Sequence, residues 1–147
     1  MSFLKSIQGH KSMSQKSTSY LNIALWAIAV LLAALYGFAG FNKVSQTIPA
    51  LSAMMGAWPA ALPEWAVRTI GSLEIAGALG LILPALTRIL PKLTPIAAAC
   101  FMLLQIGAMI THISLGEMGV LPVNLALFGL AGFLAWGRWK KVPITAR

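Results

Sequence analysis

Four long apolar blocks dominate the pattern of hydrophobic and polar positions along the chain. They cover about residues 20–41, 65–86, 93–113 and 120–137. About 20 apolar residues are needed for a helix to cross the hydrocarbon core of a membrane, and each block comes near that length. Consecutive spans joined by short links pack as antiparallel neighbours. The pattern therefore predicts an all-α membrane protein, an antiparallel four-helix transmembrane bundle.

The connection between the first two blocks is long but not polar. Leu51, Met54, Met55 and Trp58 recur in it at helical spacing. Tryptophan is enriched where lipid meets water. We expect a short interfacial helix in this first non-cytoplasmic loop, lying on the membrane surface as a lid.

Composition and charge agree with a membrane protein. The chain has 147 residues and is 59% hydrophobic, more apolar surface than a soluble domain of this size can bury. Its net charge is +8. If the spans alternate in direction, nine of the eleven Lys and Arg residues fall on one side, and only Lys43 and Arg68 on the other. Because cytoplasmic loops carry the Lys/Arg excess, both termini should be cytoplasmic.

The charge pattern also sets the predicted domains. Residues 1–19 are expected to be a flexible cytoplasmic tail, 20–140 the transmembrane domain and 141–147 a second cytoplasmic tail. No basic and aromatic module typical of nucleic-acid binding is visible, so a nucleic-acid partner is not expected.

The residue types of metal and nucleophilic sites are scarce. Cys100 is the single cysteine, which excludes an internal disulfide or a CxxC redox pair. The two histidines and three acidic residues lack metal-ligand spacing, so we predict no metal site. No phosphate-binding glycine loop and no Ser/His/Asp set is present, and no catalytic residue is assigned.

Glu74 lies near the middle of the second block, where a charge costs about 2.5–3.5 kcal/mol on insertion scales. At 100° per residue, Val67, Gly71, Ala78 and Leu81 share its helical face. The small residues leave room beside the carboxylate. Glu74 should therefore face the bundle interior, either fixing the register of a neighbouring helix or handling a ligand or proton.

Other polar residues fall at two depths. The deeper layer comprises Tyr36, Glu74 and Gln105, and the layer nearer the non-cytoplasmic surface comprises Lys43, Arg68, His112 and Asn124. Lys43 or His112 is the expected partner of Glu74. Arg68 can instead pair with Glu64, four residues before it. These seven residues of the two layers are the candidate ligand-binding or proton-handling residues.

Three segments resemble the DoxX-like family: "GFNK" at 40–43, "GSLEIAGALGLILP" at 71–84 and "LTPIAAACFMLLQIGAMITHISLGE" at 93–117. The resemblance covers about residues 22–140. It implies a multi-pass four-helix protein of the bacterial cytoplasmic (inner) membrane. Some members of this family are small subunits of thiosulfate:quinone oxidoreductases or terminal oxidases, and others belong to oxidative-stress complexes. The resemblance points to Lys43, Glu74 and His112.

The sequence thus predicts a polar intramembrane pocket that binds a quinone-like or other amphipathic molecule in support of membrane redox chemistry. The chain has no redox centre of its own, so a bound quinone or a membrane or periplasmic redox partner would supply that chemistry. A non-enzymatic membrane subunit or assembly factor with a structural polar cluster is the alternative. A small-solute or proton transporter ranks lower, because no inverted repeat is visible. The sequence leaves open whether the protein forms homo-oligomers through helix faces of small residues.

Overall fold

The computed structural model describes the backbone from residue 2 and the side chains from residue 18 to 147, and this part of the chain contains helices and no strand. The α-helices are α1 (Ser2–Ser45), α2 (Ile48–Met55), α3 (Trp58–Ala61), α4 (Glu64–Thr87), α5 (Leu93–Ser114) and α6 (Leu121–Trp136). A 3-10 turn, η1 (Met118–Val120), precedes α6, and a π-helix, η2 (Gly137–Lys141), follows it. The tail prediction for residues 1–17 lies outside the described side chains and stays a prediction.

Four helical segments are long and apolar enough to cross a membrane. They are Thr18–Ser45, Glu64–Thr87, Leu93–Ser114 and Met118–Lys141. The four predicted spans are confirmed, and three of them are longer than predicted at both ends. The apolar blocks end before the helices do, because the polar residues that follow each block still continue the backbone hydrogen bonding of the helix.

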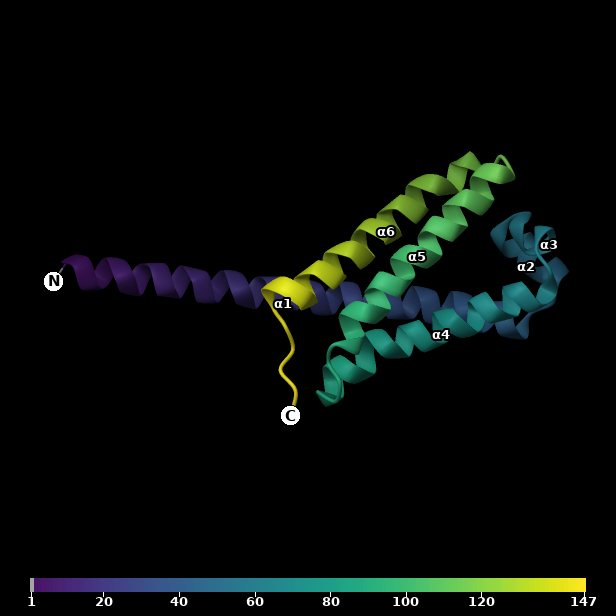
Figure 1. Cartoon of the computed structure of the whole chain (residues 1–147). Coiled ribbons are helices and arrows are strands. Elements are labelled where there is room, and N and C mark those ends of the chain that lie inside the picture. The colour runs from purple at the N-terminus through teal and green to yellow at the C-terminus, as the bar shows by residue number, and fades with distance from the viewer. Residues whose placement is uncertain (1) are drawn as a thin grey trace.

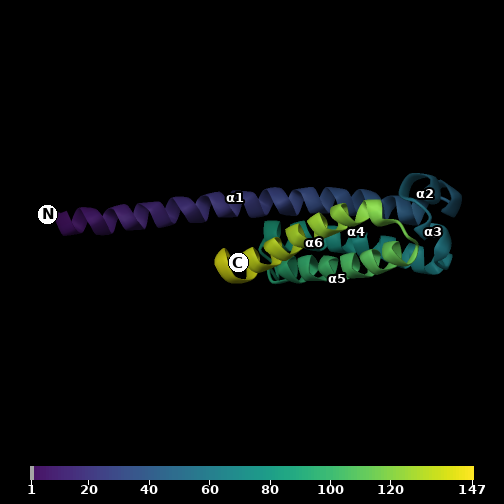
Figure 2. The same cartoon turned by 90° about the horizontal axis from the view of Figure 1, so that it is seen from above.

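The four spans are arranged as two helix pairs. α1 packs along α4, and α5 packs along α6, while α4 and α5 also touch (Figure 1). The pairs meet near η2 and the α4–α5 connection, which we call the terminal end. They diverge toward α2, α3 and η1, which we call the loop end (Figures 1 and 2).

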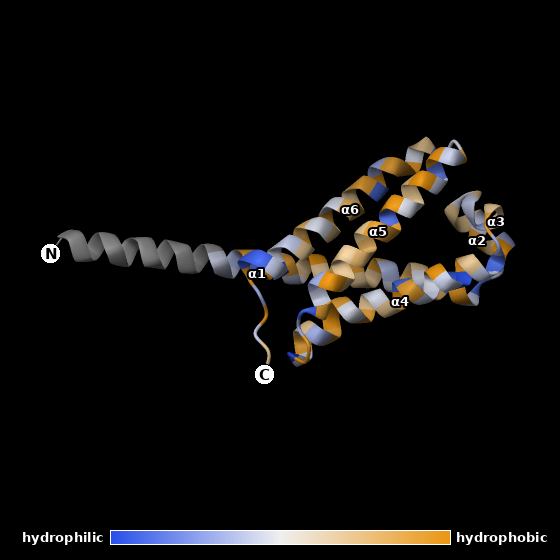
Figure 3. Cartoon of the chain, in the orientation of Figure 1, coloured by the Kyte–Doolittle hydropathy of each residue, from blue (hydrophilic) through white to orange (hydrophobic). Residues whose placement is uncertain are grey.

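The main core lies where the two pairs meet. Its buried members are Leu25, Ala29, Leu32, Tyr36, Leu81, Ala98, Phe101, Ala131 and Leu134. A smaller cluster of Leu51, Trp58 and Val67 seats α2 and α3 against α4. Many large apolar side chains are exposed instead, and orange, apolar positions recur along all four spans (Figure 3). Such surface is stable only in contact with lipid, so the bilayer completes the burial of this fold.

α1 and α4 touch backbone to backbone at Gly40 and Gly71. A Cβ on Gly40 would lie 2.6 Å from the Gly71 carbonyl oxygen. A Cβ on Gly71 would lie 2.8 Å from the Gly40 carbonyl oxygen and 2.7 Å from the Lys43 Cβ. Larger residues cannot fit without moving a helix, as at other small-residue contacts in membranes. This contact brings Lys43 beside the Glu74 face of α4.

The loop between the first two spans holds two short helices, α2 and α3, where the sequence predicted one. Gly56 separates them with φ of 93°, a conformation that L side chains rarely adopt. The turn at Gly56 ends the helical run after Met55, so Trp58 begins α3. Both helices lie at the loop end, between the diverging ends of the two helix pairs (Figure 1).

Candidate functional site

Lys43 and Glu74 form a buried ion pair between α1 and α4. The Lys43 ammonium donates to both carboxylate oxygens of Glu74, at 2.8 Å to Oε1 and 2.6 Å to Oε2. Each residue is only 6% exposed. Val67, Gly71, Ala78 and Leu81 are buried on the same face of α4, as predicted for Glu74. The two charges neutralise each other inside the protein, which makes the pair compatible with its depth.

The prediction left the partner of Glu74 open between Lys43 and His112, and the structure selects Lys43. The ammonium also lies 5.5 Å from the centre of the Trp58 ring on α3. A cation over an aromatic face is attracted by the ring quadrupole. Trp58 therefore covers the ion pair with an aromatic side chain on the side that faces the loop end of the molecule.

Arg68 binds the carboxyl end of α1 rather than Glu74. Its Nη1 donates to the carbonyl oxygens of Lys43 and Gln46, at 2.6 Å each. Its Nη2 donates to Glu64 at 2.7 Å, the pairing that the sequence suggested. The last carbonyls of a helix lack partners within the helix, and a guanidinium satisfies them. Arg68 thus holds the end of α1 beside α4.

Tyr36 and Gln105 form a second buried polar pair, deeper in the bundle. Gln105 Nε2 donates to the Tyr36 hydroxyl at 2.6 Å, and the Tyr36 ring stacks on Phe101 with centroids 3.8 Å apart. The predicted contact between these two residues is present, but Glu74 does not bond to them. Lys43 was predicted in the other polar layer. Its side chain still reaches Glu74, because a lysine side chain is long enough to cross one helical turn.

Two buried amide atoms in the interior have no hydrogen-bond partner among the described residues. They are Oε1 of Gln105 on α5 and Nδ2 of Asn124 on α6. Gln105 is 5% exposed and Asn124 is 9% exposed. Buried polar atoms without a partner are rare and usually indicate water, a ligand or strain. One of the two atoms is an acceptor and the other is a donor.

His112 and Glu117 connect α5 to the α2–α3 loop. His112 Nδ1 lies 2.7 Å from Glu117 Oε2, and the backbone N–H of Ala57 donates to Glu117 Oε1 at 2.6 Å. An ionised carboxylate only accepts, so Nδ1 carries the proton of this bond. Two hydrogen bonds lower the pKa of Glu117 below its ordinary value. The bond from the Ala57 N–H has the larger effect, and the bond to His112 has the next largest.

Sequence reasoning did not single out Glu117 as a site residue. It was quoted only in the segment that resembles the family. Its contact with Ala57 joins residues 60 positions apart. No periodic pattern reports such a contact, although an acidic residue five positions after a histidine, in a short turn, was a usable signal.

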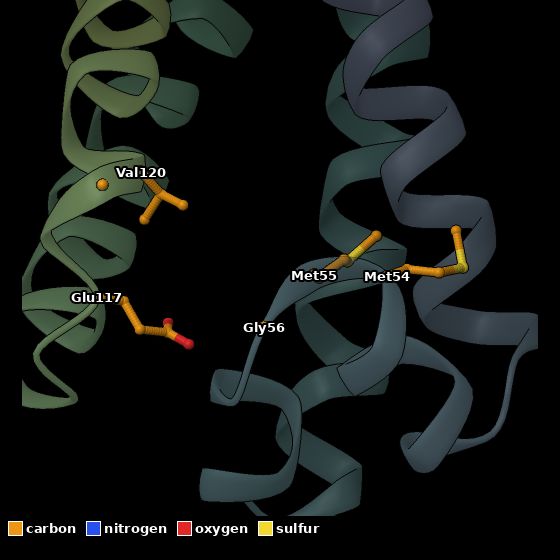
Figure 4. A pocket seen from close by; sticks show the side chains of 6 residues that line it. Met54, Met55, Gly56, Glu117 and Val120 are labelled. Atoms are coloured by element: carbon orange, nitrogen blue, oxygen red, sulfur yellow. The ribbon is translucent and has the colours of Figure 1, made fainter.

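A pocket of about 370 Å³ opens at the loop end. Its lining residues are Met54, Met55, Gly56, Glu117, Gly119 and Val120. Figure 4 shows the Glu117 side chain pointing from the α5–α6 connection toward Gly56. None of the seven predicted site residues lines this pocket. The lining is mostly apolar, with one carboxylate, and its volume is within the range of small-molecule sites.

Within residues 18–147, no three His, Cys, Asp or Glu side chains gather closely enough to hold an ion. Cys100 lies on α5 and is exposed.

Four apolar helices with a polar interior define a small helical membrane protein. The family comparison makes the assignment specific: the chain belongs to the DoxX-like family, whose model matches residues 27–134. The match includes the second and third spans in full, most of the first and fourth, and the seven predicted site residues. No curated protein and no solved structure matches the chain.

Proposed function

We propose that this DoxX-like protein binds an amphipathic, quinone-like molecule between its two helix pairs, in support of membrane redox chemistry. We place it in the bacterial inner membrane with both termini cytoplasmic, following the distribution of Lys and Arg. The observation that carries the proposal is the pair of unpartnered amide atoms, Gln105 Oε1 and Asn124 Nδ2, buried on adjacent helices.

These two atoms match the chemistry of a quinone and its reduced form. A quinone carbonyl accepts a hydrogen bond, which the Asn124 amide N–H can donate. A quinol hydroxyl can donate to Gln105 Oε1. The Tyr36 hydroxyl accepts from Gln105 Nε2, so its own proton stays available to a ligand oxygen. Each redox form would thus find a hydrogen-bond partner among these residues.

The pocket at the loop end supplies an opening for such a molecule. Its methionines are flexible, polarisable side chains that adapt to a ligand. Reaching the amides requires the α5–α6 pair to move away from α2 and α3. The direct bond across this opening is the one from Ala57 N–H to Glu117. His112 keeps Nε2 available for proton transfer, because Nδ1 is bonded to Glu117.

One observation favours the alternative, a non-enzymatic membrane subunit. Lys43 and Glu74 satisfy each other and adjoin the Gly40–Gly71 contact. A pair arranged in this way fixes the register of α1 and α4 without any ligand. The two proposals therefore assign different residues: Gln105 and Asn124 to the ligand, and Lys43 and Glu74 to the fold.

The test uses protein purified in mild detergent, with mass spectrometry of the bound small molecules and proteins. We would compare wild type, Asn124→Leu, Glu74→Gln and the control Ser72→Ala, whose exposed hydroxyl bonds its own helix. A stoichiometric quinone in wild type and Ser72→Ala, absent from Asn124→Leu, supports ligand binding.

Two results would contradict ligand binding. One is an equal amount of quinone in Asn124→Leu and wild type. The other is no bound small molecule in any sample, together with failure of a soluble short-chain quinone to change the tryptophan fluorescence of wild type. A stoichiometric protein partner and a merely less stable Glu74→Gln variant would then establish the subunit role.

A further inference from the structure

Arg138 is a buried cation at the terminal end, far from the site described above. It is 4% exposed. Its Nη1 donates to Asn22 Oδ1 of α1 at 2.7 Å and to the Val142 carbonyl oxygen at 3.4 Å. Its Nη2 has no partner among the described residues. The guanidinium thus has only neutral partners and a donor left over.

The local fold holds this guanidinium in place. η2 is a π-helix, a form that often occurs at functional sites. It approaches α1 at Gly137, where a Cβ would lie 2.5 Å from a methyl carbon of Leu25. The Arg138 guanidinium lies 5.4 Å from the centre of the Trp26 ring. The glycine, the π-turn and the two α1 side chains together create a defined corner between α1 and η2.

The charged side chains that the structure describes at this end of the bundle are basic. The basic residues of the terminal end that the structure describes are Arg88, Lys92, Arg138, Lys140, Lys141 and Arg147. The backbone N–H of Arg147 donates to the Arg88 carbonyl oxygen at 3.2 Å, which holds the C-terminal residues beside the α4–α5 connection. The acidic residues, Glu64, Glu74 and Glu117, are bonded at other places. A buried cation without a counter-charge is costly.

We infer that the corner between α1 and η2 binds a phosphate group, with Arg138 as its central ligand. A guanidinium presents two parallel N–H groups that match a phosphate. A phosphate oxygen that displaced the long contact to Val142 would accept from Nη1 and Nη2 together. A membrane supplies phosphate as the headgroup of anionic phospholipids, and the cell supplies it as the free ion.

The surroundings fit a lipid headgroup. Trp136 and Trp139 are large and exposed at this end, and tryptophan is enriched at membrane interfaces. The Lys141 ammonium lies 5.4 Å from the centre of the Trp136 ring. The aromatic rings would then contact the upper acyl chains, beside the phosphate that Arg138 holds.

The experiment is native mass spectrometry of the full chain in mild detergent, titrated with phosphatidylglycerol or with phosphatidylcholine of the same acyl chains. The variants are Arg138→Gln and the control Lys140→Gln, which removes the same charge from an exposed position two residues away. We expect wild type and Lys140→Gln to bind phosphatidylglycerol alike. Arg138→Gln should lose about tenfold in affinity, as expected for a charge-assisted hydrogen bond.

Equal losses in Arg138→Gln and Lys140→Gln, or no preference of wild type for the anionic lipid, would overturn the inference. If Arg138→Gln does not fold, Arg138→Lys keeps the charge without the planar fork and should weaken binding severalfold. A separate titration of the same proteins uses inorganic phosphate. Phosphate that raises the melting temperature of wild type but not of Arg138→Gln, without displacing phosphatidylglycerol, would support the anion site and contradict the lipid as its occupant.

Discussion

The Lys43 ammonium bonds both carboxylate oxygens of Glu74 directly beside the place where Gly40 and Gly71 bring α1 and α4 into backbone contact. The two features depend on each other. Close helix approach places the charges within 2.8 Å, and the charged pair opposes sliding of one helix along the other. A polar pair inside an apolar interface specifies register because every other register leaves both charges unpaired.

Glu74→Gln should destabilise the protein by about 3–5 kcal/mol, because it leaves the Lys43 ammonium buried without a counter-charge. Thermal unfolding in detergent measures the loss. The double variant Lys43→Met, Glu74→Leu should recover most of it, since neither charge then remains.

Glu64→Gln is the control for this prediction, because the Glu64 side chain is 63% exposed and its pair with Arg68 should contribute at most about 1 kcal/mol. Equal melting temperatures of Glu74→Gln and Glu64→Gln would show that the buried pair does not hold the fold.

Gly71→Ala should destabilise the protein by about 1–3 kcal/mol, because the added methyl overlaps Lys43 Cβ and the Gly40 carbonyl. Gly107→Ala is the matched control on α5, where a Cβ meets nothing within 4 Å. It should be neutral or stabilising by up to about 1 kcal/mol through helix propensity. Chemical unfolding in detergent compares the two. Similar behaviour of both variants would contradict a close α1–α4 contact.

Tyr36→Phe should cost about 1–3 kcal/mol, because it leaves Gln105 Nε2 buried without an acceptor while the stack on Phe101 stays. Tyr20→Phe is the control, since Tyr20 is 71% exposed. Thermal unfolding of the two variants gives the difference. A Tyr36→Phe protein as stable as Tyr20→Phe would mean that Gln105 finds another partner.

The Glu117 link between α5 and the α2–α3 loop should depend on pH. Its pKa is lowered in the folded protein, so the link stabilises the closed loop above the ordinary carboxyl pKa and is lost as the pH falls through the lowered value. The hydrogen-exchange protection factors of residues 47–62, which correct for the slower intrinsic exchange in acid, should therefore fall as the pH is lowered.

Glu117→Gln tests this assignment. Its amide oxygen can still accept from Ala57, but the charge is gone, so the protection factors of residues 47–62 should be lower at neutral pH and should no longer fall in acid. Retention of the wild-type pH profile would assign the effect to another group, with His112 the first to examine by His112→Gln.

Much of the fold could be predicted from the sequence because its signals are local. Apolar runs located all four spans, since a helix must satisfy its own backbone in lipid. The 100° periodicity correctly placed Val67, Gly71, Ala78 and Leu81 on the Glu74 face. The segments that resemble the DoxX-like family anticipated the family match.

Only the tertiary structure decided which polar groups meet. Helical periodicity gives the face of one helix, but a contact between helices also depends on their rotation, crossing and axial offset. The Gly40–Gly71 contact set these for α1 and α4 and so selected Lys43 for Glu74. The bonds of Ala57 to Glu117 and of Arg138 to Asn22 join residues 60 and 116 positions apart. The sequence by itself therefore determined that this protein is a four-span bundle with a polar interior, and packing decided the partners within it.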